Sequence, residues 1–393
     1  MFNKSIYHIV TTPGENTNNS IVINWHSLIK NSYLLLSNDN FKTYNKYIPN
    51  SEILWDMNNI DNIKDDSFKS ISRYVCNVKL TLLIPNTTYY YKIINEEDES
   101  SIYSFKTTGN NDFDIFACVD LQHPFNKETP LLINNLCKIS PNTSILLCSG
   151  DLTGCACVED EWSYILDNNL FNNLIVGSGV GDHEYWGDTF PNHIPMTKEP
   201  YAFNHLFSNP KNGCSSLINS NYYFYINNVL VIVFNTLDSN TTISNLLNEQ
   251  LIWFDNIMNK LKNTYDYSIV LMHKSIYGSK IIDSSVVKNM KEPFNIIFNK
   301  YHVDLVISGH DHIYSRTSMI NNTTYYLDMG SSGNKRRDVD DSLLLDSVYE
   351  KILDIKNNNQ TIGSIIHVNK DFMEINVYDQ TNYLVDKFTI YKK

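Results

Sequence analysis

Five apolar segments of the chain each lead into an aspartate or a histidine, and these side chains could bind metal ions. The segments are residues 113–119, 144–148, 174–176, 267–272 and 303–307. Carboxylates and imidazoles are ligands that iron, zinc and manganese accept, so the pattern indicates a transition-metal site. The polar residues after the segments are Asp120, Gly150-Asp151, Gly181-Asp182-His183-Glu184, His273 and Gly309-His310-Asp311-His312.

The segments themselves have the character of buried strands. Short continuous apolar runs are typical of strands covered on both faces of a sheet. Helical patterns at residues 159–166 and 244–261 favour an α/β layer, and residues 221–235 and 363–391 predict further antiparallel strands. Ligands of an open α/β sheet bind beyond the carboxyl ends of its strands. We therefore expect the five polar ends to converge, with glycine before Asp151, Asp182 and His310 allowing tight turns.

Each polar end has an ordinary alternative when it is taken alone. An aspartate after a strand is more often a helix N-cap or a turn residue, and an isolated histidine in a loop is usually solvated. His310 and His312 are more specific, because two histidines at i and i+2 in a turn can reach neighbouring ions. The order of all five ends favours a dinuclear site, where a carboxylate can bridge two ions, and the pair of ions positions and deprotonates a water and shields charge on the phosphoryl oxygens.

Residues 1–108 differ in pattern from the rest of the chain. Strand-like segments at 20–25, 78–83, 88–93 and 101–107, separated by turn residues, predict an antiparallel β-sandwich. A short polar linker begins at position 108. We predict two domains, 1–108 and 109–393; the alternative is that the first segment is an edge subdomain of the same fold.

Composition limits the partners and the compartment. The net charge of −12 without a basic stripe argues against binding to nucleic acid or to an anionic membrane. An acidic protein that handles an anionic substrate needs a local positive centre, which metal ions would supply. Seven cysteines without disulfide-type spacing, no signal-peptide pattern and no apolar segment of membrane length predict a cytoplasmic protein. Cys155 and Cys157 are expected to be buried, although thiolates also bind zinc.

The five motifs resemble those of the calcineurin-like metallophosphoesterases, in particular the purple acid phosphatase-like branch. That branch has an Asp motif, Gly-Asp-x-x-Tyr, Gly-Asn-His-Glu, an apolar-x-x-His motif and Gly-His-x-His, which continues into x-Tyr-x-Arg. Here Tyr314 and Arg316 match that continuation. The resemblance covers nearly the whole chain. It implies an α/β (α+β) metallophosphoesterase sandwich of central sheets flanked by helices, behind a fibronectin-III-like β-sandwich.

The resemblance also implies residue roles. A metal-activated hydroxide would attack the phosphorus of a small phosphorylated substrate, with two ions of iron, zinc or manganese as cofactors. His183 would contact phosphate and protonate the leaving group as general acid, and Glu184 would orient His183. Arg316 would either reach phosphate or form a structural ion pair. The metal ligands would be Asp120 and His312 for one ion, Asp182, His273 and His310 for the other, and Asp151 between them.

Three departures from the family pattern change the expected metal chemistry. Gly154 stands in place of the tyrosine that ligates ferric iron, so the first ion lacks that ligand. Gln122 occupies the place where other metallophosphoesterases have a histidine, and it could act as a weak ligand or hold a water. Asp182 replaces the usual asparagine and adds an anionic ligand, which favours a pair of divalent ions.

Four functions compete on these residues. Hydrolysis of phosphomonoesters, as in acid phosphatases, is the leading hypothesis, and cleavage of phosphodiesters at the same metals is the second. A catalytically silent metal-binding protein that uses the sandwich for adhesion is the third; it predicts lost ligands, whereas position 154 alone clearly lacks a metal-binding side chain. A glycosidase built on paired carboxylates leaves the histidines unexplained.

Overall fold

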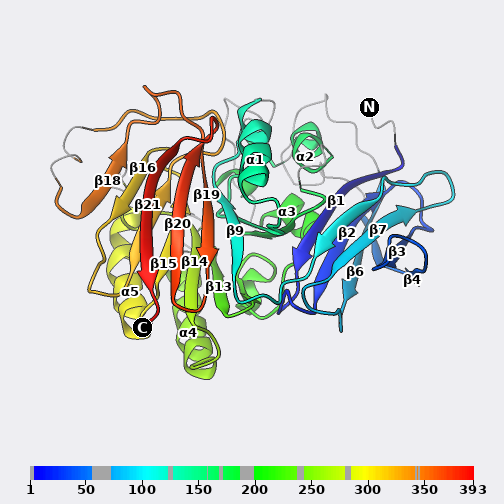
Figure 1. Cartoon of the computed structure of the whole chain (residues 1–393), viewed down its shortest axis with the longest axis horizontal. Helices are drawn as coiled ribbons and strands as arrows, with labels where there is room; N and C mark the ends of the chain where they lie inside the picture. The colour runs from blue at the N-terminus through cyan, green and yellow to red at the C-terminus, as the bar shows by residue number, and fades with distance from the viewer. Residues whose placement is uncertain are drawn as a thin grey trace.

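The computed structural model (Figure 1) describes residues 4–54, 72–122, 127–156, 158–167, 171–185, 199–236, 243–278, 285–340, 343 and 346–393. Within these residues, the strands form sheets of ten, seven and four strands. The two larger sheets face one another across a shared apolar core, and helices cover their outer faces. The layered architecture predicted from the sequence, central sheets flanked by helices, is confirmed.

The ten-stranded sheet joins strands from both ends of the chain. Its centre is the parallel set β9 (Phe113–Cys118), β10 (Ile145–Cys148) and β11 (Ile175–Ser178), in which Leu146 lies beside Phe116 and Val176. Helices α1 (Glu128–Ile139), α2 (Glu159–Leu166) and α3 (Tyr201–Leu206) cover its outer face, where Leu132 and Trp162 join the same buried cluster. In spatial order the strands are β21 (Leu384–Tyr391), β20 (Phe372–Asp379), β19 (Ile362–Val368), β9 (Phe113–Cys118), β10 (Ile145–Cys148), β11 (Ile175–Ser178), β1 (Ile6–Pro13), β2 (Ile21–Ser27), β6 (Arg73–Leu80) and β5 (Asn50–Leu54).

The seven-stranded sheet carries the second half of the polar ends. Helices α4 (Ile243–Lys260) and α5 (Ser285–Tyr301) cover its outer face, and Phe254, Phe294 and Phe298 form part of that buried cluster. In spatial order its strands are β12 (Tyr222–Ile226), β13 (Val229–Phe234), β14 (Tyr267–Lys274), β15 (Leu305–Gly309), β17 (Tyr325–Met329), β16 (Tyr314–Thr317) and β18 (Tyr349–Leu353).

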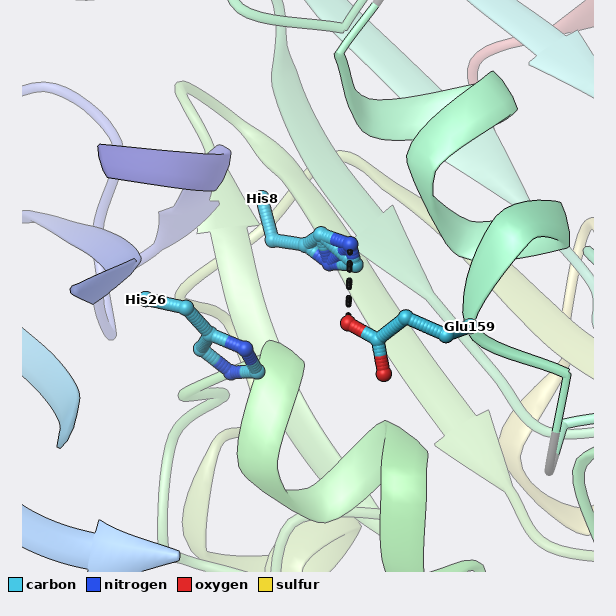
Figure 2. Close-up of side chains that lie close together, drawn as sticks. All are labelled: His8, His26 and Glu159. Atoms are coloured by element: carbon cyan, nitrogen blue, oxygen red, sulfur yellow. Dashed lines mark ion pairs between the residues drawn. The ribbon is translucent and has the colours of Figure 1, made fainter. Parts of the chain in front are cut away.

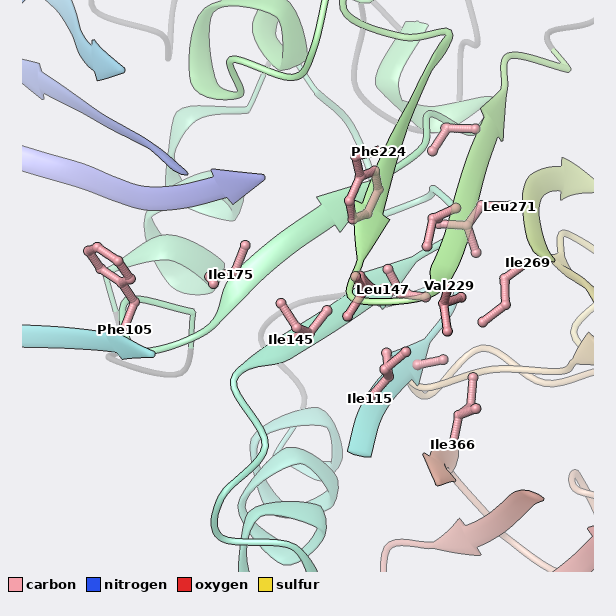
Figure 3. Packing of buried hydrophobic residues seen from close by; sticks show 14 of the residues in the cluster. Phe105, Ile115, Ile145, Leu147, Ile175, Phe224, Val229, Ile269, Leu271 and Ile366 are labelled. Carbon is pink, nitrogen blue, oxygen red and sulfur yellow. The ribbon is translucent and has the colours of Figure 1, made fainter. Parts of the chain in front are cut away.

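The core explains why the strand segments are continuously apolar. Leu147 and Leu271 point into the layer between the two sheets (Figure 3), while their neighbours Leu146 and Val270 point to the helical layers. Side chains alternate between the faces of a strand, so a strand that is covered on both sides needs apolar residues at every position.

The N-terminal strands form a sandwich that is continuous with the rest of the molecule. The four-stranded sheet β4 (Asn45–Tyr47), β3 (Tyr33–Ser37), β7 (Thr88–Ile94) and β8 (Tyr103–Lys106) supplies Tyr91 and Phe105 to the same core cluster as Trp25 of β2. However, β1 pairs in parallel with β11, with Thr11 opposite Ile175. The division into domains 1–108 and 109–393 and the fibronectin-III-like character therefore stay predictions.

The predicted segments appear as strands, but they do not share one sheet. The segments before Asp120, Asp151 and Asp182 are β9, β10 and β11, whereas those before His273 and His310 belong to β14 and β15 of the other sheet. None of the helices in the described part of the chain combines the length and apolarity needed for a membrane span.

Candidate metal centre

The ends of β9, β10, β11, β14 and β15 bring six side chains into two groups. Within each group, one ligand-type atom of every residue lies within 4.8 Å of the others. These six are the residues that the sequence predicts as metal ligands, and their division into two groups follows the predicted division between two ions. Their role as ligands stays a prediction. The groups are Asp120, Asp151 and His312, and Asp182, His273 and His310.

Asp151 lies between the two groups. It belongs to the first, yet its Oδ2 is only 3.3 Å from Nε2 of His273 in the second. Within the second group, Nδ1 of His310 is 3.5 Å from Oδ2 of Asp182. A carboxylate shared in this way has the position that a ligand bridging two ions requires.

Two of the histidines are held in orientations suited to metal binding. Nδ1 of His273 donates to the carbonyl oxygen of Ser149 (3.2 Å), and Nδ1 of His312 donates to that of Lys335 (3.0 Å). In the neutral, metal-binding form of both rings the lone pair is therefore on Nε2, as is usual when a backbone carbonyl fixes a metal-binding histidine. Nε2 of His273 and Oδ1 of Asp182 are buried and form no hydrogen bond among the described residues, and their contacts are the ion pairs with Asp151 (3.3 Å) and Lys274 (3.5 Å). The donor set thus fits transition-metal ions.

The electrostatics of the groups also fit a cation. Burial, together with the charge of Asp151, raises the pKa of Asp120 to about 8. Burial lowers the pKa of His273, but the carboxylates of Asp151, Asp120 and Asp182 outweigh it and raise the value to about 10. Both shifts reflect buried negative charge that retains protons. Metal ions at this place would supply the missing positive charge.

The backbone is unusual at four of the six candidate ligands. A positive φ is uncommon for residues other than glycine and costs free energy, and such residues cluster at functional sites. Here it occurs in the loops that follow β9, β10 and β15. The four are Asp120 (φ 50°), Asp151 (φ 53°), His310 (φ 74°) and His312 (φ 56°).

Glycines make room for the carboxylates. A Cβ on Gly181 would lie 2.1 Å from Oδ1 of Asp151, and one on Gly309 would lie 1.9 Å from Oδ2 of Asp120. Gly150, with φ 106°, does occupy the turn conformation that the sequence analysis expects. At Gly181 and Gly309 the reason for glycine is therefore steric space for a neighbouring carboxylate.

His183 begins a short 3₁₀ helix (His183–Tyr185) beside Asp151. Its backbone N–H donates to Oδ1 of Asp151 (3.0 Å), and its Nδ1 donates to the carbonyl oxygen of Gly154 (2.5 Å). Nε2 then lies 3.7 Å from Oδ2 of Asp151. Burial lowers the pKa of the His183 imidazole. The ring is thus fixed with one nitrogen toward the candidate ligands, and its role as general acid stays a prediction.

Glu184 binds backbone groups of the loops that carry two candidate ligands. Its carboxylate accepts hydrogen bonds from the N–H groups of Asp151 (2.9 Å), Leu152 (2.8 Å) and Gly181 (2.7 Å). Burial raises its pKa to about 7. These contacts make Glu184 a positioning residue for both loops. If Glu184 orients His183, as predicted, it would do so through these loops.

Gly154 and Cys155 are held by one carboxylate of α2. Their backbone N–H groups donate to Oε2 of Glu161, at 2.5 and 3.0 Å. A Cβ on Gly154 would lie 3.1 Å from that oxygen, so a tyrosine would require Glu161 to move. Cys155 is buried, as expected, and Cys157 lies outside the described residues.

Lys335 is a residue of this site that the sequence did not reveal. Its Nζ lies 2.9 Å from Oε1 of Gln122 and 3.5 Å from Nε2 of His183. Oγ of Ser331 and the backbone N–H of Ser332 bond the loop that carries Lys335 to the segment at Asp120. A lone lysine 152 residues from His183 carries no pattern that sequence analysis could have recognised.

Gln122 presents its amide nitrogen to the carboxylates. Nε2 donates to Asp151 and, at 3.3 Å, to Oδ1 of Asp120. Ligation of a metal through its oxygen would require the amide to rotate away from these contacts. The weak-ligand role stays a prediction.

Arg316 forms a structural ion pair, which is the alternative to a contact with phosphate. Its Nε lies 2.7 Å from Oδ2 of Asp386, its NH1 pairs with Glu350, and its guanidinium lies over the ring of Phe388. The contact with phosphate stays a prediction that these partners do not support.

Replacing Arg316 with methionine should destabilise the protein by about 3 kcal/mol, because it leaves the Asp386 carboxylate, whose side chain is only 7% exposed, without its counter-charge. Urea unfolding would measure the loss. Glu350→Gln is the matched control: Glu350 is 55% exposed, so its loss should cost under about 1 kcal/mol. Equal losses in the two variants would contradict the assignment.

The chain matches two known families along its length. The profile of the N-terminal domain of purple acid phosphatases matches residues 6–107, and that of the calcineurin-like phosphoesterases matches residues 113–314. "Probable purple acid phosphatase 20" of Arabidopsis thaliana is 25% identical over 267 residues, which are 64% of this chain and 59% of that protein. Phosphoenolpyruvate phosphatase of Allium cepa is 31% identical over 83 residues, 21% of this chain and 17% of that protein. The chain thus spans less than two thirds of these relatives.

Solved structures share the fold at low sequence identity. A purple acid phosphatase from yellow lupin (Lupinus luteus) seeds superposes with a TM-score of 0.79 at 15% identity, over 99% of this chain and 74% of that one. PhoD superposes with a TM-score of 0.62 at 12% identity, over 100% and 94% of the two chains.

Proposed function

The chain belongs to the calcineurin-like phosphoesterase family. From this premise we propose that it hydrolyses phosphate esters, primarily phosphomonoesters, at two metal ions. The observation that carries the proposal is the pair of three-residue groups that meet at the buried Asp151. Iron, zinc and manganese all suit the ligands, and the extra carboxylate of Asp182 favours a pair of divalent ions.

In this mechanism the protein's own residues hold the two ligand groups in place and supply a proton to the leaving group. Bound metal ions would supply an activated water and positive charge for the phosphoryl oxygens. Asp151 would fix the spacing of the two ligand groups, while Glu184 holds the loops of Asp151 and Asp182 in place. His183 would donate a proton to the leaving oxygen from Nε2, because its Nδ1–H is bound to the carbonyl of Gly154. Lys335 would bind a phosphoryl oxygen beside His183.

The test compares p-nitrophenyl phosphate with its bis ester after the purified full chain is loaded with zinc, manganese or iron. Faster turnover of the monoester supports the proposal, and faster turnover of the diester replaces it with a phosphodiesterase. Absence of turnover with both, at two bound equivalents of metal, would overturn hydrolysis. Less than one equivalent under saturating supply favours the silent adhesion protein.

Lys335→Met should raise KM for p-nitrophenyl phosphate at least about tenfold and weaken inhibition by inorganic phosphate by a similar factor, because one charged hydrogen bond to the substrate is lost. The measurement is KM and kcat with phosphate inhibition constants. Lys335→Arg should recover part of the affinity.

Lys356→Met is the control for the loss of a lysine charge. Lys356 is 45% exposed and pairs with Asp338 on the surface. An equal rise of KM in both variants, or unchanged KM in Lys335→Met, would remove Lys335 from the phosphate site.

A further inference from the structure

A second buried cluster of ligand-type residues lies where the N-terminal strands meet α2. It consists of His8 on β1, His26 on β2 and Glu159 on α2 (Figure 2), and one ligand-type atom of each lies within 4.8 Å of the others. Nε2 of His8 is 3.3 Å from Oε1 of Glu159. The cluster shares no residue with the candidate metal centre.

An irregularity in β1 brings the two imidazoles together. Tyr7 pairs with His26, the ladder then shifts before Val10, and His8 has a φ of 51°. Such a bulge can turn a side chain toward a site that a regular strand would not reach. The centres of the His8 and His26 rings are consequently 5.3 Å apart.

His26, like His273 in the candidate metal centre, is fixed by a backbone carbonyl, but through the other ring nitrogen. Its Nε2 donates to the carbonyl oxygen of His205 (3.1 Å), which leaves the lone pair on Nδ1. Nδ1 is buried and has no hydrogen-bond partner among the described residues, and Figure 2 shows this side of the ring toward His8 and Glu159. A backbone carbonyl that fixes the opposite nitrogen is the usual support of a metal-binding histidine.

The surrounding charges leave Glu159 available for a cation. Arg73 pairs with Oε1 of Glu159, whose Oε2 is buried without a hydrogen-bond partner among the described residues. Asp167, which accepts a hydrogen bond from the backbone N–H of His8 (2.7 Å), adds a second carboxylate, with Oδ2 3.9 Å from Nε2 of His8. The two carboxylates exceed the single charge of Arg73. Burial lowers the pKa of His26 to about 3, so its imidazole is neutral and can act as a ligand.

We propose that His8, His26 and Glu159 bind one zinc-class divalent cation, with Asp167 or a water in the fourth position. Two imidazoles and a carboxylate are an established zinc ligand set. The hydroxyl of Ser163, 3.1 Å from Nε2 of His8, would give way to the ion. A cavity of roughly 320 Å³ lies beside the cluster and is lined in part by Ser163 and Asp167, two residues that approach His8. The ion would tie β1 and β2 to α2 and is independent of the proposed hydrolysis.

Zinc binding by the full chain tests this site separately from the catalytic one. In the variant Asp151→Ala/His310→Ala, which disables the candidate centre, about one equivalent of Zn²⁺ should remain after equilibrium dialysis. Adding His26→Ala should remove it. Adding His367→Ala should not, although His367 also faces a carboxylate, with Nδ1 2.8 Å from Oδ1 of Asp114.

A double variant that retains no zinc, or a triple variant with His26→Ala that retains it, would overturn the site. Crystals of the unmodified chain soaked in zinc provide a test that does not depend on the folding of any variant. An anomalous peak between His8, His26 and Glu159 supports the site. Peaks at the candidate centre alone would refute it.

Discussion

Asp151→Ala should lower kcat/KM for phosphate esters by at least about a thousandfold and reduce the metal bound at the candidate centre. Asp151 belongs to one ligand group and lies 3.3 Å from His273 of the other, so its removal weakens both. It also removes the acceptor for the backbone N–H of His183. Steady-state kinetics with metal analysis of the same sample would measure both effects.

Two further variants separate the loss of the Asp151 charge from a general loss of structure. Asp151→Asn keeps the shape and one oxygen but loses the charge, so it should retain more metal than Asp151→Ala and little activity. Asp371→Ala removes an exposed carboxylate, 68% accessible, and should leave both quantities unchanged. Full turnover by Asp151→Ala would remove this residue, and the dinuclear site with it, from the mechanism.

His183→Asn should lower kcat for alkyl phosphates by roughly 10²–10⁴-fold, the usual contribution of a positioned acid. The loss should be much smaller for p-nitrophenyl phosphate, because nitrophenolate leaves without needing a proton. Bound metal should stay unchanged, since His183 is outside both ligand groups. The measurement is kcat across esters with leaving groups of increasing pKa.

The dependence on the leaving group distinguishes an acid from a structural histidine. A steeper fall of kcat with rising leaving-group pKa in the variant supports proton donation by His183. His367→Asn is the matched control, because His367 also contacts a carboxylate, that of Asp114, but belongs to neither candidate ligand group. An equal loss for all esters would show that His183 only binds or positions the phosphate.

The six candidate ligands could be located from the sequence because each lies at the end of a buried strand or within four residues after it. An apolar run, a turn and an aspartate or histidine are contiguous, so local pattern is enough to find Asp120 or His273. What local pattern cannot supply is pairing: β10 and β14 have equally apolar sequences, yet they belong to different sheets. Lys335 and the backbone contacts of Glu184 were missed for the same reason, since both depend on loops that meet only in the folded chain.

The helices show where periodicity is and is not informative. Residues 159–166 and 244–261 have helical spacing and form α2 and α4. Helix α5 contains Pro293 in its interior, and proline predicts a break because it removes a backbone donor. Burial of Phe294 and Phe298 against the sheet outweighs that cost.

The parallel pairing of β1 with β11 has a consequence for any attempt to divide the chain. A fragment that begins at residue 109 would leave β11 as an open border strand, with its backbone amides and carbonyls exposed. Exposed borders of this kind recruit strands from other molecules. Such a fragment would be prone to aggregate, whereas in the intact chain β1 covers this border by pairing with β11.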